Sequence, residues 1–295
     1  NTRLRLTYMR NRYEYNYDEP HPYLFNATTN QPIYYPSESS YLPGPGGRIQ
    51  NIWGGLFETE IFKKLKTKLN LSYMTTEKDW YVTVGDGAKT WGCPTPGSTC
   101  GYVSNTPQMA FQGDLQFSLP IFNNQILTFG GAYRWEYADT KEKYLRNWKD
   151  ETSTLNLKYQ SKGKTRTWSF FAQDEISLRE NLTAYLGFRY DDWKTYDGYA
   201  NQVGSKGYPK EYPSNTETSF SPKVSLVYKP FDWTLLRGSV GKAFRPPTVY
   251  ELYRTWTASS GTTYAGNPNL KPETTTSYEI GIEQRLWRGA KLSFT

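Results

Sequence analysis

The chain has 295 residues, of which 37% are hydrophobic and 17% aromatic, and its formal net charge is +7. Disordered chains are poor in aromatic residues, so 26 Tyr, 14 Phe and 10 Trp exclude disorder. The sequence contains no run of about 18 apolar residues, which excludes a transmembrane helix. A transmembrane β-barrel stays possible, because its strands alternate lipid-facing apolar with lumen-facing polar residues.

Apolar and polar residues alternate with a period of two along the whole chain, which predicts about eleven strands of roughly ten residues. From 65 onward, for example, Leu69, Leu71 and Tyr73 share one face, while Lys68 and Asn70 share the other. In chain order, strands are expected near 2–9, 48–62, 65–77, 107–119 and 125–137. Three later pairs are expected to meet at tight turns at 178–181, 229–232 and 287–289, with the last strand starting at Ala290.

Short and long connections alternate between these strands. Tight turns join the strands of each pair, and long polar segments separate the pairs at 10–47, 78–106, 138–165, 192–217 and 244–273. Outer-membrane barrels have short periplasmic turns and long extracellular loops, whereas the strands of a soluble β-sandwich are shorter. The rhythm therefore favours an all-β, transmembrane antiparallel β-barrel in the bacterial outer membrane. Within 138–165, Leu155, Leu157 and Tyr159 lie at strand spacing and predict that the barrel extends above the membrane.

The two cysteines, Cys93 and Cys100, are joined by a spacer rich in proline and glycine. Such a spacer can turn back, so we expect a disulfide-closed loop in an oxidising compartment. The segment 78–106 places this loop on the outside of the barrel.

The charge of the chain suits an acidic ligand or a lipopolysaccharide-rich surface. Nucleic acid is not expected as a partner, because the sequence has no long Lys/Arg block. The single histidine, His21, argues against a histidine-based metal site, and no cofactor is expected. An outer-membrane barrel protease would need convergent carboxylates and a His–Asp couple, but the adjacent Asp191 and Asp192 point to opposite faces of a strand. The chain is therefore not expected to be an enzyme, and a passive porin stays as the other alternative.

Eleven strands do not close a barrel of the bacterial kind, which has an even number of strands and no open edge in lipid. We therefore expect residues 1–295 to be an internal part of a larger barrel. A 22-stranded barrel would need roughly twice this length.

Two stretches carry a family resemblance. The first runs from Phe171-Ala-Gln-Asp-Glu175 through a short turn to Leu186-Gly-Phe-Arg-Tyr-Asp191. The second joins two motifs through a loop, and its residues are Phe244, Arg245, Pro246, Pro247, Asn267, Pro268, Asn269 and Leu270. Over about 165–286 the chain resembles the β-barrel of TonB-dependent outer-membrane receptors, although Pro246 stands where the family commonly has Ala.

The resemblance implies a 22-stranded barrel with an N-terminal plug, which imports a scarce nutrient chelate with energy coupled through TonB from the inner membrane. Neither a plug domain nor a TonB box is found in these 295 residues. The motif prolines fix φ and remove donors, so the motif residues are expected to be rigid loop ends rather than ligand contacts.

The cargo has to be inferred from the loops and the lumen-facing cations. Heme receptors of the family commonly carry a histidine between the two motifs, and 249–266 contains none, so heme is disfavoured. The scarcity of methionine argues against a copper receptor. Aromatic and cationic residues suit an anionic, ring-bearing chelate, with a ferric siderophore as the best candidate and cobalamin, a sugar or another metal complex left open. The candidate ligand-binding residues are Tyr253, Arg254, Trp256, Tyr264, Arg134, Arg189 and Arg237.

Overall fold

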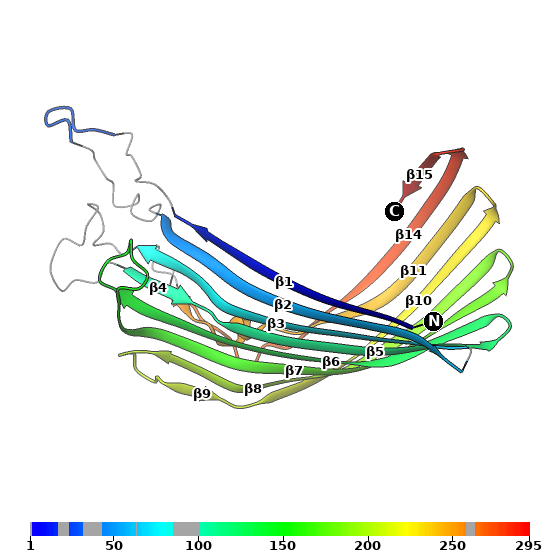
Figure 1. The fold of residues 1–295 in the computed structure, drawn as a ribbon, viewed down its shortest axis with the longest axis horizontal. Helices are drawn as coiled ribbons and strands as arrows, with labels where there is room; N and C mark the ends of the chain where they lie inside the picture. Colours follow the sequence, from blue (N-terminus) through cyan, green and yellow to red (C-terminus); the bar gives the residue numbers. More distant parts are fainter. Residues whose placement is uncertain (1, 17–23, 32–42, 63, 85–100, 258–262) are drawn as a thin grey trace.

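A computed structural model describes residues 2–16, 24–31, 43–62, 64–84, 101–257 and 263–295. These residues form one large antiparallel sheet that curves into a trough (Figure 1), with one short helix and a separate two-stranded pair. The large sheet consists of β1 (Thr2–Tyr15), β2 (Pro43–Ile61), β3 (Leu65–Val84), β4 (Gly101–Asn105), β5 (Gln108–Phe122), β6 (Gln125–Leu145), β7 (Thr154–Arg179), β8 (Leu182–Gln202), β9 (Lys210–Tyr212), β10 (Asn215–Phe231), β11 (Thr234–Arg245), β14 (Glu273–Trp287) and β15 (Ala290–Phe294). The remaining elements are α1 (Val249–Tyr253), β12 (Trp256–Thr257) and β13 (Thr263–Tyr264).

The strands follow one another across the sheet almost in chain order. The main order is β1-β2-β3-β4-β6-β7-β8-β10-β11-β14-β15, so eleven strands stand side by side in the described residues, as the alternation predicted. β5 continues the position of β4, because both pair with β3 and β6, and β9 pairs only with β8. Such a meander of neighbours needs tight turns at one end, and turns do occur at 123–124, 180–181, 232–233 and 288–289. Among the described residues, no helix is long and apolar enough to cross a membrane.

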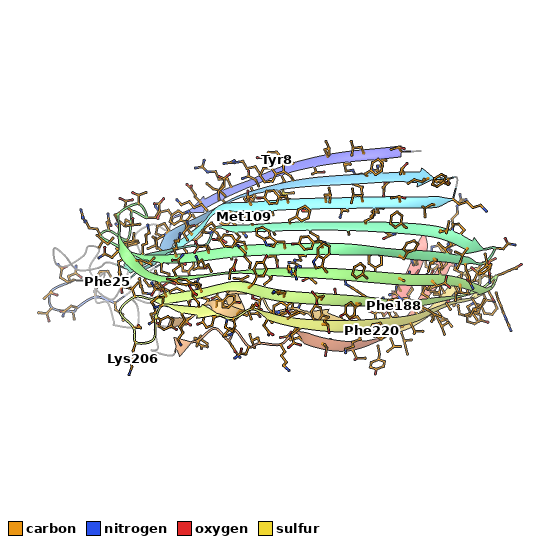
Figure 2. The ribbon with its side chains drawn as sticks, turned by 90° about the horizontal axis from the view of Figure 1, so that it is seen from below. Tyr8, Phe25, Met109, Phe188, Lys206 and Phe220 are labelled. Carbon is orange, nitrogen blue, oxygen red and sulfur yellow. The ribbon has the colours of Figure 1, made fainter. Side chains whose placement is uncertain are left out.

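The two faces of the sheet differ sharply in chemistry. The convex face carries exposed aromatic and aliphatic side chains, including Tyr8, Met109, Phe188 and Phe220 (Figure 2). Phe170, for example, is 61% exposed there, although transfer of an aromatic ring into water is unfavourable. A continuous apolar face of this kind is stable against lipid tails, which identifies the convex face as the membrane-facing one. The concave face carries the polar residues of each strand.

Several strands continue well beyond their expected ends. β6 reaches Leu145, β7 starts at Thr154 and β8 runs to Gln202. The expected extension of the barrel within 138–165 is confirmed. The segment 192–217, expected as a long polar connection, consists largely of strand, in β8, β9 and the start of β10. These outer parts leave the lipid, so both of their faces can be polar and the apolar alternation that marks a membrane strand is lost.

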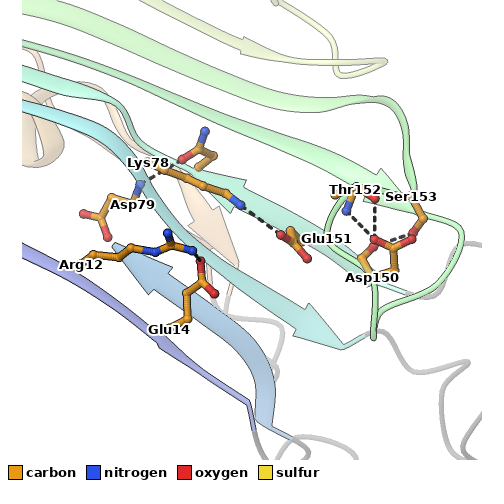
Figure 3. Close-up of polar contacts among 9 residues, drawn as sticks. Arg12, Glu14, Lys78, Asp79, Asp150, Glu151, Thr152 and Ser153 are labelled. Carbon is orange, nitrogen blue, oxygen red and sulfur yellow. Dashed lines mark hydrogen bonds and ion pairs between the residues drawn. The ribbon is translucent and has the colours of Figure 1, made fainter. Parts of the chain in front are cut away.

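Polar contacts hold the outer ends of the strands together (Figure 3). Lys78 of β3 pairs with Glu151, which lies in the connection between β6 and β7, with 3.0 Å between Nζ and Oε1. In that connection, Asp150 accepts hydrogen bonds from the hydroxyl and the backbone N–H of Thr152, at 2.6 and 2.9 Å. These hydrogen bonds lower the pKa of Asp150 below its ordinary value. The ionised Asp150 carboxylate therefore stabilises this turn.

Asp174 is a charged residue within the apolar part of the convex face. Asp174 of β7 lies opposite Leu127 of β6 and Leu186 of β8, on the face that meets lipid. Its Oδ1 is buried, and no hydrogen-bond partner for it exists in the described part of the chain. A buried polar atom without a partner lowers the stability of a fold.

We therefore expect Asp174→Leu to raise the free energy of unfolding by about 1–2 kcal/mol, because it removes an unsatisfied carboxylate from the lipid face. Denaturant unfolding in lipid vesicles would measure the change. Glu175→Leu is the matched control, since Glu175 lies next to Asp174 but points to the polar concave face, and it should not stabilise. A loss of stability in Asp174→Leu would contradict the expectation.

Candidate functional site

The concave face of β5 to β11 contains a pocket of about 520 Å³. Its lining includes four cationic side chains and one carboxylate, namely Arg134, Arg189, Lys223, Lys242 and Asp191. The register places Arg134, Arg189, Asp191 and Lys223 at inward-facing positions of neighbouring strands: Asp191 lies opposite Ser169, and Arg189 lies opposite Ser221. Lys242 shares the parity of Val240, which lies on the convex face, and it lines the pocket where β10 and β11 no longer pair. The excess of positive charge suits an anionic group.

Two of the arginines are held by neighbours on the wall. Arg189 donates from Nε to Asp191 at 2.8 Å and from Nη2 to Ser169 at 2.7 Å, and Ser169 itself donates to Asp191 at 2.6 Å. Arg134 donates to Glu136 at 2.5 Å. Each arginine therefore shares its charge with a carboxylate and is fixed in direction.

Lys223, Lys242 and Ser221 complete the lining without such partners. Neither lysine makes an ion pair within the described residues, and the buried Oγ of Ser221 has no hydrogen-bond partner there. On the side of the Lys223–Gly241 pair away from the short turn at 232–233, β10 and β11 no longer pair with each other. Lys242 and Phe244 line the space between the two strands there. Donors that lack an internal acceptor are the groups most able to bind an incoming anion.

The two sequence motifs meet at α1, on the concave side of the outer part of the barrel. Thr248 caps α1, with its hydroxyl accepting from the backbone N–H of Glu251 at 3.2 Å, and the Glu251 carboxylate accepts from the Thr248 backbone N–H at 2.8 Å. Arg245 donates to the same carboxylate at 2.8 Å. This reciprocal capping explains why so short a helix forms directly after two prolines.

Tyr253, the last residue of α1, anchors the helix to β7 and β8. Its hydroxyl lies 2.5 Å from Thr195 Oγ1, and its carbonyl accepts a hydrogen bond from Tyr159 at 2.9 Å. The ring fills a slot that two glycines leave open, and a Cβ on Gly198 would come within 2.5 Å of it. Burial raises the pKa of Tyr253, so the phenol stays protonated and donates or accepts as the contact requires.

Arg254 forms a buried ion pair with β6. Its Nη2 donates to Glu142 at 3.0 Å and to the Tyr81 hydroxyl at 2.7 Å, and Lys158 donates to the other oxygen of Glu142 at 2.7 Å. The buried guanidinium links β3 and β6 directly, and Glu142 extends the cluster to Lys158 of β7.

The second motif closes the loop onto the same anchor. The backbone N–H of Asn267 donates to the Glu251 carbonyl at 3.2 Å, and Leu270 packs against the cluster of Trp193, Leu252 and Tyr253. The geometry of both motifs is that of packed loop ends.

The candidate ligand residues fall into three groups. Arg134 and Arg189 line the pocket, whereas Arg237 lies on the same face but donates to Thr295 at 2.7 Å. Tyr253 and Arg254 are 1% and 7% exposed and contact the barrel wall, so ligand contact by them does not fit this arrangement. Tyr264 is half exposed, and the side chain of Trp256 lies outside what the structure describes.

The sequence did not predict Ser221 and Lys223, because no face had been assigned to the strand that contains Pro222, although alternation with the exposed Phe220 places both on the polar face. Lys242 could not be found in this way, since alternation with the lumen-facing Arg237 places it on the opposite face. The expected disulfide of Cys93 and Cys100 lies outside the described residues, as does His21. Within the described ranges, no group of three His, Cys, Asp or Glu side chains is placed to hold a metal ion.

The slot around Tyr253 gives a first test. Gly198→Ala should destabilise the docking of α1 by about 1–3 kcal/mol, because its Cβ would overlap the ring. Hydrogen exchange of the backbone at 249–255 would report the loss of protection. Gly238→Ala is the control, since its Cβ would meet only the Glu279 carbonyl at 4.0 Å. Equal protection in both variants would rule out the anchor.

The capping carboxylate gives a pH test. The Thr248 backbone N–H and Arg245 lower the pKa of Glu251 below its ordinary value of 4.5. A lowered pKa means that the stabilisation is complete above that ordinary value and is lost as the pH falls through the lowered one. Exchange at 248–255, corrected for its intrinsic pH dependence, should therefore be constant from about pH 7 to 5 and accelerate below about pH 4. In Glu251→Gln the acceleration should vanish, and its persistence would assign the effect to another group.

The comparisons with known proteins agree with this architecture. A family described as TonB dependent receptor-like, beta-barrel matches residues 1–295. A hemin receptor of Yersinia pestis is 34% identical over 134 residues, which cover 42% of this chain and 18% of that receptor. A ferric enterobactin receptor of Pseudomonas aeruginosa is 23% identical over 229 residues, which cover 72% of this chain and 28% of that receptor.

Among solved structures, the ferric-catecholate import receptor Fiu of E. coli K12 has a similar fold, with a TM-score of 0.62 at 12% identity over 97% of this chain and 47% of that chain. The chain spans less than half the length of each of these three proteins. Its family consists of outer-membrane receptors and transporters rather than enzymes. The chain belongs to the TonB-dependent receptors, as part of their β-barrel in the bacterial outer membrane.

Proposed function

We propose that the chain forms the wall of an outer-membrane receptor that binds an anionic nutrient chelate and imports it with TonB-coupled energy. The observation that carries this proposal is the concave pocket, in which four cationic side chains face one carboxylate. An anionic chelate that enters such a positively charged space is attracted over several ångströms. A passive porin would not account for membership of a receptor family.

A ferric siderophore of the catecholate type is the cargo that we propose. Its charge matches the pocket, and its rings match the aromatic residues of the loops. The names of two similar proteins, a ferric enterobactin receptor and a ferric-catecholate import receptor, support this class. The plug and the segment that contacts TonB would be contributed by polypeptide outside residues 1–295.

Hemin is the second candidate, because the hemin receptor of Yersinia pestis is 34% identical over the segment that it matches. The absence of a histidine from 249–266 argues against hemin. Both cargoes are anionic and aromatic, so charge alone does not separate them, and the test has to include each.

The test uses the full-length receptor in iron-limited cells that lack their other receptors. Lys223→Gln with Lys242→Gln should lower uptake of a ferric catecholate about ten-fold or more, since two charge-assisted contacts are worth more than about 1.4 kcal/mol together. These lysines are chosen because neither forms an ion pair within the described residues, so their replacement does not leave a carboxylate unpaired.

Lys229→Gln, at an exposed position near the end of β10 and beside the short turn at 232–233, is the control for loss of charge. Hemin and the cobalt-containing cobalamin are offered in parallel. Uptake of hemin but not of the catecholate would replace the first cargo with the second. Equal uptake by the double variant and the control would show that the pocket does not bind the cargo.

A further inference from the structure

Two cations face each other on the convex side of the barrel, where no carboxylate of the described residues pairs with them. Arg166 of β7 pairs directly with Lys194 of β8 in the strand register. Both share the face of Trp168 and Phe170, which are exposed toward the membrane. Side chains directly opposite one another on neighbouring strands lie about 4.5–5.5 Å apart at Cβ, and like charges at that distance destabilise a sheet.

The neighbouring charges do not neutralise this pair. Lys164, the next residue of β7 on the same face in the direction away from the short turns, already forms an ion pair with Asp197 at 2.9 Å. Asp192, which lies opposite Trp168, makes no ion pair with either cation in the described residues. The Nε of Arg166 is buried and has no hydrogen-bond partner there. A guanidinium whose buried N–H lacks an acceptor in the described residues is a group that favours binding of an anion.

The position of the pair relative to the apolar face decides what kind of anion fits. Along β7, the apolar face begins at Leu178 beside the short turn and ends at Trp168, ten residues further. At about 3.4 Å per residue and a tilt of about 45°, these residues span about 24 Å across the membrane. This height matches the apolar band of an outer-membrane barrel, which is about 25 Å. Arg166 is therefore the first residue beyond the hydrocarbon on the side opposite the short turns.

That level is the headgroup layer of the outer leaflet, because the short turns of such barrels are periplasmic. Aromatic side chains frame the pair, as is usual at a membrane interface. The Trp135 ring, on the strand position next to Arg166, is fixed by a hydrogen bond from its Nε1 to the Tyr196 hydroxyl at 2.9 Å.

We propose that Arg166 and Lys194 bind the phosphate of a lipid headgroup in the outer leaflet. One phosphate between the two cations would cancel their repulsion and accept a hydrogen bond from the unpaired Nε–H of Arg166. The acyl chains of the lipid would then lie along Trp168 and Phe170. The site stands on the convex face and is independent of the cargo pocket. It binds a fixed membrane component rather than a transported one.

The test compares full-length receptor variants in a zwitterionic, phosphate-free detergent. Native mass spectrometry would follow the binding of rough-type lipopolysaccharide and of the same lipid after enzymatic removal of its phosphates. Arg166→Gln with Lys194→Gln should weaken binding of the phosphorylated lipid at least ten-fold, and the wild type should bind the dephosphorylated lipid as weakly as the variant does. Lys206→Gln, in an exposed loop far from the apolar face (Figure 2), is the control and should bind like the wild type.

A second readout separates binding from a merely structural role. Without phosphorylated lipid, Arg166→Gln should raise the unfolding midpoint because it removes the like-charge pair. In its presence, the order should reverse, with the wild type the more stable. Unchanged lipid binding in the double variant would overturn the proposal. So would saturation of the wild type by millimolar inorganic phosphate with no preference for the lipid, because the site would then take a free anion.

Discussion

The hydrogen-bonding requirement of the backbone in lipid governs the rest of this structure. Hydrocarbon offers no acceptor or donor, so every strand that crosses it has to pair with neighbours on both sides. The long registers between β5, β6, β7 and β8, which shift only toward the strand ends, satisfy this demand, and they fix which side chains share a level. Because successive residues alternate in direction, the same registers also fix two faces with opposite chemistry. Both the concave pocket and the convex cationic pair are consequences of this one arrangement.

The outer end of the barrel is held differently, because water there can satisfy the backbone and pairing alone no longer imposes a shape. The connection that follows β11 turns back onto the inside of the wall and is tied to it by side chains. Tyr253 fills a slot made by missing Cβ atoms, Arg254 is buried against Glu142, and the capping carboxylate of Glu251 holds the start of α1. Residues that sequence alone marks as aromatic and cationic candidates for a ligand are, in this fold, what keeps a loop in place.

Charge is distributed on the two faces for different physical reasons. On the concave side, Arg189 and Arg134 are fixed by carboxylates, so their charge is partly balanced and their direction is set. Lys223 and Lys242 add charge that the described wall does not balance. On the convex side, the apolar face leaves room for charge only above the hydrocarbon, and Arg166 with Lys194 occupies that level. An anion that approaches from solution meets the first set, and an anion that is part of the membrane meets the second.

The sequence by itself determined the class of fold, the number of strands side by side and the inward and outward faces of several of them. It could do so because lipid on one side and a polar interior on the other impose a period of two on the parts of the strands that cross the membrane. The family followed from motifs whose prolines and glycines serve local geometry. Leu155, Leu157 and Tyr159 at strand spacing predicted the outer part of β7, whereas the outer half of β8 could not be foreseen, since strands that leave the lipid lose that pattern.

Only the tertiary structure decided which residues form a site. Arg166 and Lys194 are 28 positions apart, and Ser221, Lys223 and Arg189 come from two strands, so their proximity depends on register rather than on local sequence. Burial separated Tyr253 and Arg254, which face the wall, from Arg134 and Arg189, which face the pocket. Residue type shows what chemistry a side chain can perform, but pairing across strands determines what stands next to it.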